Sequence, residues 1–271
     1  GSEQKNIKKK LLDLYSSLIS DNKIIFMDML SAELTKYASN AMLATKISFI
    51  NEIANISDFL GADIDLVRKG IGSDKRIGFS FINPGPGYGG SCFPKDVKAL
   101  ISKAQTFDYN PRLLRATDLV NRAQKTIIFS KVVKIFGNNL SGLKFAVWGL
   151  SFKPETDDIR ESPSIELIKS LNKAGATVAA YDPRAINQFK QAMPKNQPLL
   201  TYMESKDLCV EGADALVVMT EWTEFTVSDF SSIKSALKKP IIFDARNFLE
   251  EGMLRSLGFQ YFGIGRGKNA R

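Results

Sequence analysis

One of the two cysteines lies where a reactive thiol is expected. Cys92 follows the loop 81–91, which holds four glycines and two prolines. Pro94 then marks the start of a predicted helix and makes Phe93 its expected N-cap. The free N–H groups and the positive dipole end of a helix favour the thiolate form of a nearby cysteine. The pattern favours a nucleophilic thiol, with an unreactive loop cysteine as the alternative.

Side chains that could assist such a thiol occur at two places. Lys95 adds positive charge beside the helix start, and Asp96, in the first turn, could accept a proton or hold a water molecule. Far upstream, Lys36 and Asn40 are four residues apart and share one face of a predicted helix. An ammonium and an amide on one face could stabilise an oxyanion. An ordinary solvated helix surface is the alternative.

The 271-residue chain contains no histidine. Ser-His-Asp triads, Cys-His pairs and histidine-based zinc sites are therefore excluded, and acid–base chemistry must use other side chains or water. The second cysteine, Cys209, lies at the apolar end of a predicted helix and is expected to be buried and inert. Two cysteines are too few for a disulfide framework or a cysteine-zinc site, so we expect a reduced, cytoplasmic protein without a metal.

The charge balance bears on possible partners. Lys plus Arg number 37 and Asp plus Glu number 29, for a net charge of +8. Nucleic-acid-binding proteins cluster their cations and interleave them with aromatic residues. Since this chain does not, we expect small anionic ligands rather than nucleic acid. No apolar run approaches the roughly 18 residues of a membrane span, so no membrane partner is expected.

The N-terminal segment is predicted to be incomplete as a folding unit. Apolar residues recur at helical spacing over 5–19, and 23–27 is expected to form a short buried strand. One helix and one strand cannot bury their faces alone, so 1–28 is interpreted as the end of a larger α/β domain that is otherwise absent. Gly1-Ser2 is typical of a cloning remnant.

A helical domain is predicted to follow over 29–137. Its longest helix is expected to run from an N-cap at Ser31 to Leu60, with Gly61 after its end. One face of this helix carries the residues expected to pack: Leu34, Ala38, Ala41, Thr45 and Phe49. The other helices of this domain are predicted over 63–70, 94–104 and 113–136.

Strands alternate with helices over 138–271, the predicted C-terminal domain. The expected strands are 145–149, 177–182, 214–220 and 241–244. This alternation favours an open, mainly parallel sheet, and hence an α/β fold for the domain. Lys153 and Arg160 follow the first strand and could neutralise a diphosphate there, although no complete GxGxxG fingerprint is present. Asp182, after the second strand, could bind a ribose or form an Asp-Pro turn.

Three stretches resemble the UDP-glucose 6-dehydrogenase family, which includes GDP-mannose dehydrogenases. These stretches are 32–49, 85–96 and 148–162, in the order of the family. The resemblance extends over nearly the whole chain and implies a helical central domain followed by a Rossmann-like UDP-binding domain. The family's N-terminal NAD domain is largely absent by this match, so the chain alone is expected to be inactive.

The resemblance implies the oxidation of UDP-glucose to UDP-glucuronate with two NAD⁺. In the family's chemistry the thiol that matches Cys92 captures an aldehyde as a thiohemiacetal, which is oxidised to a thioester and hydrolysed. By the same match Lys36 binds substrate, and Lys36 and Asn40 together stabilise the oxyanions. Asp96 positions or deprotonates water.

The resemblance also implies binding roles. Lys153 and Arg246 match UDP ligands, and Lys95 and Arg160 match contacts to NAD. Arg76 matches an arginine that reaches the UDP-sugar of a neighbouring subunit. The glucose pocket would be lined by the backbone of Phe81, Ile82, Asn83, Pro84, Gly85 and Gly89.

Alternatives within and outside the family stay open. GDP-mannose 6-dehydrogenase shares the Gly-Gly-Ser-Cys and Pro-Lys-Asp core, whereas UDP-N-acetylhexosamine dehydrogenases depart from it. A non-catalytic module that binds a nucleotide sugar and dimerises is another possibility for this chain. The resemblance makes the predicted helix over 113–136 the expected homodimer element.

Overall fold

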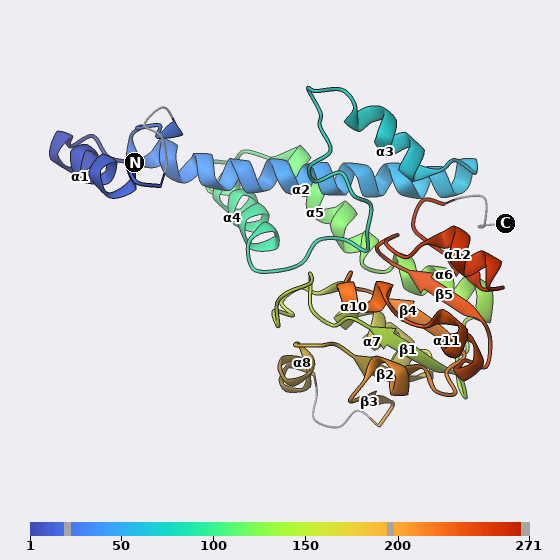
Figure 1. The fold of residues 1–271 in the computed structure, drawn as a ribbon. Helices are drawn as coiled ribbons and strands as arrows, with labels where there is room; N and C mark the ends of the chain where they lie inside the picture. Colours follow the sequence, from blue (N-terminus) through green and yellow to red (C-terminus); the bar gives the residue numbers. More distant parts are fainter. Residues whose placement is uncertain (19–22, 194–197, 267–271) are drawn as a thin grey trace.

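The computed structural model describes residues 1–18, 23–193 and 198–266. Its longest element is the helix α2 (Met29–Leu60), which runs along one side of the molecule (Figure 1). The helix α1 (Lys5–Tyr15) lies at the N-terminal end of α2, and the β-sheet lies below its C-terminal half. α2 therefore spans the molecule and connects its parts.

The ends of α2 are set by a carboxylate and a glycine. Asp28, rather than the expected Ser31, is the N-cap, because its carboxylate accepts a hydrogen bond from Ser31 N at 2.8 Å. Ser31 is the third helical residue, whose N–H group has no acceptor inside the helix. The predicted end is confirmed, since Gly61 has a φ of +75°.

The packed face of α2 differs from the predicted one. Its buried residues are mostly small: Ala41, Ala44, Ser48, Ile50, Asn51, Ala54 and Ser57. Leu34 and Phe49, which were expected in this face, are 58% and 53% exposed. Small side chains allow α4 (Phe93–Gln105) and α5 (Arg112–Gln124) to approach α2 closely, so the large ones remain outside.

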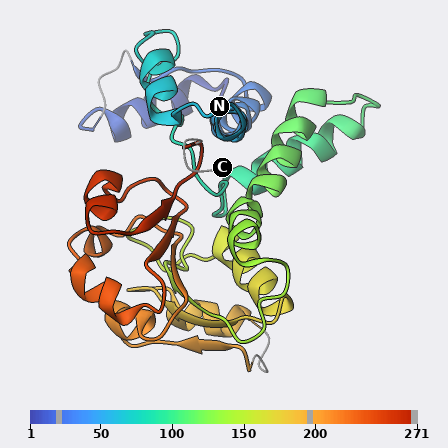
Figure 2. The same cartoon turned by 90° about the vertical axis from the view of Figure 1, so that its right-hand side faces the viewer.

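The single helix predicted over 113–136 is wrong. The chain forms two helices, α5 and α6 (Ile127–Phe136), with a break between them. α5 packs on α2, whereas α6 packs on α7 (Pro163–Lys173) beside the sheet. The two halves therefore have different packing partners, and Figure 2 shows α4 and α5 projecting away from the sheet.

The strand predicted over 23–27 is also wrong. Residues 24–27 have no regular structure, and Ile25 is 77% exposed. A strand is stable only when its backbone pairs with a neighbour, and no described strand pairs with this one. By contrast, α3 (Ile64–Gly72) confirms the helix predicted over 63–70, with Asp63 as its N-cap.

Six parallel strands among the described residues form one sheet in the order β3-β2-β1-β4-β5-β6. The strands are β1 (Lys144–Trp148), β2 (Thr177–Tyr181), β3 (Leu200–Tyr202), β4 (Ala215–Val218), β5 (Ile241–Asp244) and β6 (Gln260–Phe262). The shorter helices are α8 (Ile186–Ala192), α9 (Lys206–Val210), α10 (Thr223–Thr226), α11 (Phe230–Ala236) and α12 (Glu251–Ser256). The predicted open parallel sheet is confirmed.

The sheet is buried on both faces. Along β1, Phe145 and Val147 belong to a core that includes α6 and α7, while Ala146 and Trp148 face the other core. Strands that are buried on both faces have nearly continuous apolar sequences, and β1 and β4 have such sequences. The strand order reverses between β1 and β4, where α/β sheets open a crevice at the carboxyl ends of their strands. In the described part of the chain no helix could cross a membrane.

Candidate active site

Cys92 begins α4 and is exposed. Its carbonyl oxygen accepts the hydrogen bond of Asp96 N at 2.9 Å, the first of the helix, so Cys92 itself is the N-cap and the expected N-cap at Phe93 is wrong. Pro94 then occupies the second helical position, where its missing N–H group costs nothing. The thiol therefore lies at a helix N-terminus, as predicted.

The side chains of Lys36, Asn40 and Asp96 meet directly beside this helix start. Lys36 Nζ and Asn40 Nδ2 both donate to Asp96 Oδ2, the second at 2.6 Å. Lys95 Nζ lies 3.4 Å from the other oxygen, and the Asp96 side chain has no exposed surface. Lys36 and Asn40 therefore both pair with a buried carboxylate, while the Lys36 side chain stays 52% exposed.

The contact between Asp96 and Lys36 shifts the pKa values of both side chains. Burial raises the pKa of Asp96, but hydrogen bonds from Lys36, Asn40 and Lys95 outweigh it, and the pKa lies below its ordinary value. The hydrogen bond to Asp96 is the main cause that raises the pKa of Lys36, and a negative charge on Cys92 makes a smaller contribution. The same thiolate charge acts on Arg160, after its bond to Asp158. Cys92 thus has cations from α2 and from the loop after β1 near it.

The glycines before Cys92 let the loop contact the C-terminal domain. Gly90 N donates to Arg160 O at 2.7 Å. A Cβ on Gly89 would lie 2.6 Å from Glu161 O, and one on Gly90 would lie 2.8 Å from the Phe152 ring. These positions accept only glycine without a shift of the neighbouring backbone or ring.

Glu161 ties the loop after β1 to the helical domain. Its carboxylate accepts from Lys98 Nζ at 2.8 Å and from Lys125 Nζ at 2.7 Å. These two hydrogen bonds lower the pKa of Glu161 to about 2. Its pairing partners lie 63 and 36 residues away in the sequence, so local spacing gave no sign of this contact.

Three buried amide side chains on α2 and α5 form hydrogen bonds with the backbone of the glycine-rich loop before Cys92. Asn51 Oδ1 accepts from Gly85 N and Gln124 Nε2 donates to Gly85 O, both at 2.8 Å. Asn121 accepts from Tyr88 N at 2.7 Å and donates to Tyr88 O at 3.1 Å. None of these three residues was predicted from the sequence. The signal for two of them is the polar line of Thr117, Asn121 and Gln124 on α5, at the spacing of one helix face.

Arg246 lies at the carboxyl ends of three strands. Its guanidinium donates to Phe152 O at 2.9 Å and to Met219 O at 3.0 Å, after β1 and β4 respectively. Asp244, at the end of β5, fixes the arginine by accepting from its backbone N at 2.9 Å. A Cβ on Gly85 would lie 3.4 Å from Arg246 Nη1. The predicted sugar loop and the predicted UDP ligand are therefore neighbours.

Lys153 and Asp182 have different surroundings. Lys153 Nζ lies 5.6 Å from the centre of the Phe152 ring at the edge of the same crevice. Asp182 is 2% exposed, and its carboxylate accepts from Leu150 N and Ala185 N, both at 2.7 Å. A carboxylate occupied in this way supports the turn interpretation of Asp182 and not the ribose-binding one.

The remaining predicted residues divide between the loop and the surface. Phe81 has a φ of +63° and stands edge-on to Phe93, with ring centres 6.0 Å apart. Ile82 and Pro84 are buried, whereas Asn83 is exposed. Arg76 does not join the Cys92 group: it is 88% exposed and pairs with the nearby Asp74.

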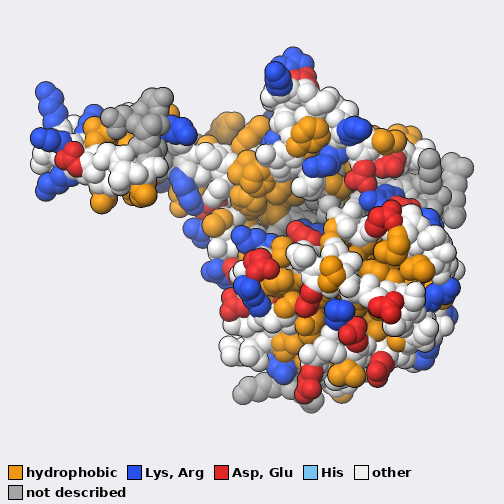
Figure 3. Space-filling view, in the orientation of Figure 1, with side chains coloured by type: hydrophobic (Ala, Val, Ile, Leu, Met, Phe, Trp, Pro, Cys, Tyr) orange, Lys and Arg blue, Asp and Glu red, His pale blue; other side chains and the backbone are white. Residues whose placement is uncertain are grey.

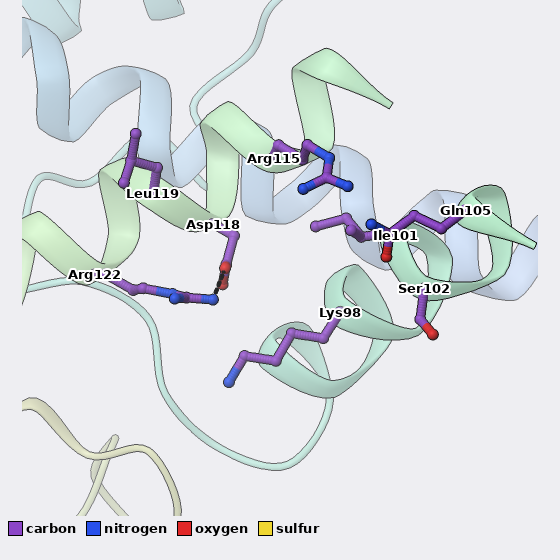
Figure 4. Close-up of a pocket in the computed structure, with 8 residues that line it drawn as sticks. All are labelled: Lys98, Ile101, Ser102, Gln105, Arg115, Asp118, Leu119 and Arg122. Carbon is purple, nitrogen blue, oxygen red and sulfur yellow. Dashed lines mark hydrogen bonds and ion pairs between the residues drawn. The ribbon is translucent and has the colours of Figure 1, made fainter. Parts of the chain in front are cut away.

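Two hollows lie away from the predicted residues. One, of about 380 Å³, lies between α4 and α5 (Figure 4). Its lining residues are Lys98, Ile101, Ser102, Gln105, Arg115, Asp118, Leu119 and Arg122. The other, of about 870 Å³, lies between the C-terminal end of α2, α6 and β6. Neither hollow is lined by Cys92 or Arg246. Within the described ranges no cluster of metal-ligating side chains occurs.

Both parts of the chain match a known protein family in sequence. The profile of the UDP-glucose/GDP-mannose dehydrogenase family matches residues 30–123 as its central domain and 146–251 as its UDP-binding domain. The chain is 44% identical over 269 residues to a UDP-glucose 6-dehydrogenase of Pseudomonas aeruginosa, which covers 98% of this chain and 59% of that protein. It therefore spans about three fifths of this relative.

Solved structures of UDP-glucose and GDP-mannose dehydrogenases also superpose on this chain. A UDP-glucose dehydrogenase from Pyrobaculum islandicum superposes with a TM-score of 0.86 at 30% identity, over 98% of this chain and 57% of that one. A GDP-mannose dehydrogenase from Pseudomonas aeruginosa superposes with a TM-score of 0.55 at 27% identity, over 97% and 59%. Since both domains match in order, the chain belongs to the UDP-glucose/GDP-mannose dehydrogenase family.

Proposed function

We propose that this chain carries the thiol and the UDP-sugar site of an enzyme that oxidises UDP-glucose to UDP-glucuronate with two NAD⁺. The observation that carries the proposal is that Lys36 and Asn40 both donate to Asp96, which lies in the first turn of the helix that Cys92 caps. A nucleophile, two donors and a buried carboxylate are the groups that covalent aldehyde oxidation needs. The division into 29–137 and 138–271 is part of the proposal.

The chain's own residues perform the covalent steps. The Cys92 thiolate adds to the C6 aldehyde carbon, and the carbonyl electron pair moves to oxygen, where Lys36 and Asn40 donate hydrogen bonds. After oxidation to the thioester, Asp96 holds the water that attacks the carbonyl carbon and accepts one proton from it, and the second proton of the water goes to solvent. The carbon–sulfur bond then breaks, and the carboxylate and the thiolate are released.

Two exposed cations beside the thiol fit a dinucleotide. The side chains of Lys95 and Arg160 are 65% and 67% exposed, and their charge suits a diphosphate. They would hold NAD⁺, which supplies the hydride acceptor for both oxidations. Both cysteines are free thiols, which favours a reducing compartment such as the cytoplasm.

The homodimer element expected over 113–136 stays a prediction, and we propose α2 as the dimer surface instead. Met42, Phe49 and Ile56 are seven residues apart and 61%, 53% and 45% exposed, so they form one apolar line along the helix. Figure 3 shows apolar side chains gathered over this part of the molecule. Lys46 Nζ donates to Ile77 O at 2.9 Å, which keeps the loop of Arg76 beside this line. A second copy docked on α2 would therefore meet Arg76, as the proposed role of this arginine requires.

Among family substrates UDP-glucose is favoured over GDP-mannose. Relatives that are 44% and 42% identical to this chain are named UDP-glucose 6-dehydrogenases, whereas the GDP-mannose dehydrogenase structure is 27% identical, and this difference supports the order. A non-catalytic module that binds a nucleotide sugar is the second candidate, and in such a module Cys92 would have no covalent role.

A covalent test separates the enzyme from the module. The chain is incubated with the 6-aldehyde of UDP-glucose, and alkylation of Cys92 by iodoacetamide is followed by mass spectrometry. We expect the aldehyde to protect Cys92 at lower concentration than UDP-glucose does, because only the aldehyde forms a bond to sulfur. Equal protection by the two compounds would contradict the covalent role.

A further inference from the structure

The loop 84–90 is buried, yet its backbone has no neighbouring strand or helix to pair with. Buried N–H and C=O groups that lack a hydrogen-bond partner destabilise the fold, so such groups need partners. Side chains supply them here. Asn51, Asn121 and Gln124 are 0%, 3% and 1% exposed, so their bonds to the loop are shielded from water.

An amide is the side chain that such a loop requires. Asn121 both accepts from and donates to Tyr88, as a neighbouring β-strand would. At Gly85 the same two bonds are divided between Asn51, which accepts, and Gln124, which donates. Asn55 Nδ2 in turn donates to Gln124 Oε1 at 2.8 Å and fixes the orientation of that amide. A carboxylate could only accept, and an apolar side chain could do neither.

Gly85 and Tyr88, whose backbone the amides bind, belong to the proposed sugar loop, which contacts Arg246 and the loop after β1. Gly85 approaches Arg246 on one side, and three residues later Tyr88 leads into Gly89 and Gly90, which contact the loop after β1. The bonds at Gly85 thus set the distance between the sugar loop and the crevice of Arg246. The amides themselves are buried beneath the loop and act through its backbone.

We propose that Asn51, Gln124 and Asn121 are positioning residues that select for the sugar part of the ligand, because they hold the backbone that faces it. This inference rests on the proposed binding of UDP-glucose. UDP itself would be held mainly by Lys153 and Arg246. Loss of an amide should therefore weaken the binding of UDP-glucose far more than the binding of UDP.

The test measures both ligands on the same variants. Asn51→Ala removes the acceptor for Gly85 N, and Gln124→Met removes the donor to Gly85 O while keeping a similar volume. The matched control is Ser48→Ala, which removes a buried hydrogen bond between α2 and α5 (Ser48 Oγ to Thr117 O, 2.9 Å) without touching the loop. Dissociation constants for UDP and UDP-glucose are measured by calorimetry, and folding is checked by urea unfolding.

We expect each amide variant to bind UDP-glucose about tenfold more weakly, a loss of about 1.4 kcal/mol, and UDP less than about threefold more weakly. Ser48→Ala should leave the ratio of the two constants unchanged. A parallel loss for both ligands in folded amide variants would overturn the positioning role. If the unaltered chain binds neither UDP nor UDP-glucose, the proposed function itself fails. A variant that does not fold is replaced by Asn121→Asp, which keeps one of two bonds and for which the same selective loss is expected.

Discussion

The ammonium of Lys36 donates to the buried carboxylate of Asp96, which follows it by 60 residues. Asn40 donates to the same oxygen. α2 and the first turn of α4 are therefore joined by a charge-assisted contact directly beside Cys92. This contact organises the candidate site, and it can be broken without changing the size of any side chain.

Replacing Asp96 by Asn should destabilise the fold. The variant loses the charge that Lys36 and Asn40 are oriented to meet, and hydrogen bonds to charged groups contribute about 1.5–3 kcal/mol. Urea unfolding should show a loss in this range. Asp74→Asn is the control, because Asp74 pairs with an exposed Arg76 and exposed pairs contribute little. Equal small losses in the two variants would contradict the account.

The two thiols should differ strongly in reactivity. Cys92 is exposed, whereas Cys209 is fully buried and burial raises its pKa to about 12. In the folded protein at neutral pH a thiol reagent should therefore modify Cys92 and leave Cys209 until the protein unfolds. Cys92→Ser should abolish the labelling of the folded state. Labelling of both thiols at similar rates would show that the core around Cys209 opens readily.

Gly89 and Gly70 should respond oppositely to alanine. A Cβ at Gly89 meets Glu161 O at 2.6 Å, so Gly89→Ala should cost about 1–3 kcal/mol and loosen the loop before Cys92. Gly70, inside α3, has no atom within 4 Å of such a Cβ, and Gly70→Ala should stabilise by about 0.5–1 kcal/mol. Thermal unfolding of both variants checks the pair. A stable Gly89→Ala protein would contradict the described contact.

The Glu161 contact should appear in the pH dependence of stability. Its folded pKa of about 2 lies below the ordinary value of 4.5, so its stabilisation is present above about pH 4.5 and is lost as the pH falls toward 2. Since the side chain is 42% exposed, solvent screening limits the contribution to about 1 kcal/mol. Glu161→Gln should be less stable than the unaltered chain at pH 6, and the difference should shrink on acidification. A difference that stays constant down to pH 3 would contradict the ion-pair interpretation.

The dimer proposal also makes a specific prediction. Phe49→Glu places a charge in the apolar line of α2 and should shift the protein toward monomers in sedimentation experiments. Phe107→Glu is the matched control, because Phe107 is 71% exposed but lies beyond the end of α4. Dissociation by both variants, or by neither, would argue against an interface on α2.

Much of the architecture follows from local sequence signals. Strands with continuous apolar residues, such as β1 and β4, and helix ends marked by Gly61 and Asp63 were predictable because their causes lie within a few residues. The position of Cys92 at a helix start followed from Pro94 in the same way.

Features that depend on distant partners were not predictable. The exposure of Phe49 depends on how closely α4 and α5 approach the small residues of α2. The break between α5 and α6 arises because they pack on different elements. The bonds that Asn51 and Glu161 make join residues far apart in sequence, and no local pattern encodes them.

The most direct test is a thermal-shift titration of this chain with UDP, UDP-glucose and GDP-mannose. A ligand at 100 times its Kd should add about 2.7 kcal/mol of stability, which is seen as a higher Tm. The account predicts a rise with UDP and a larger rise with UDP-glucose at equal concentration, and none with GDP-mannose. A rise with GDP-mannose alone, or no rise with any of the three, would contradict it.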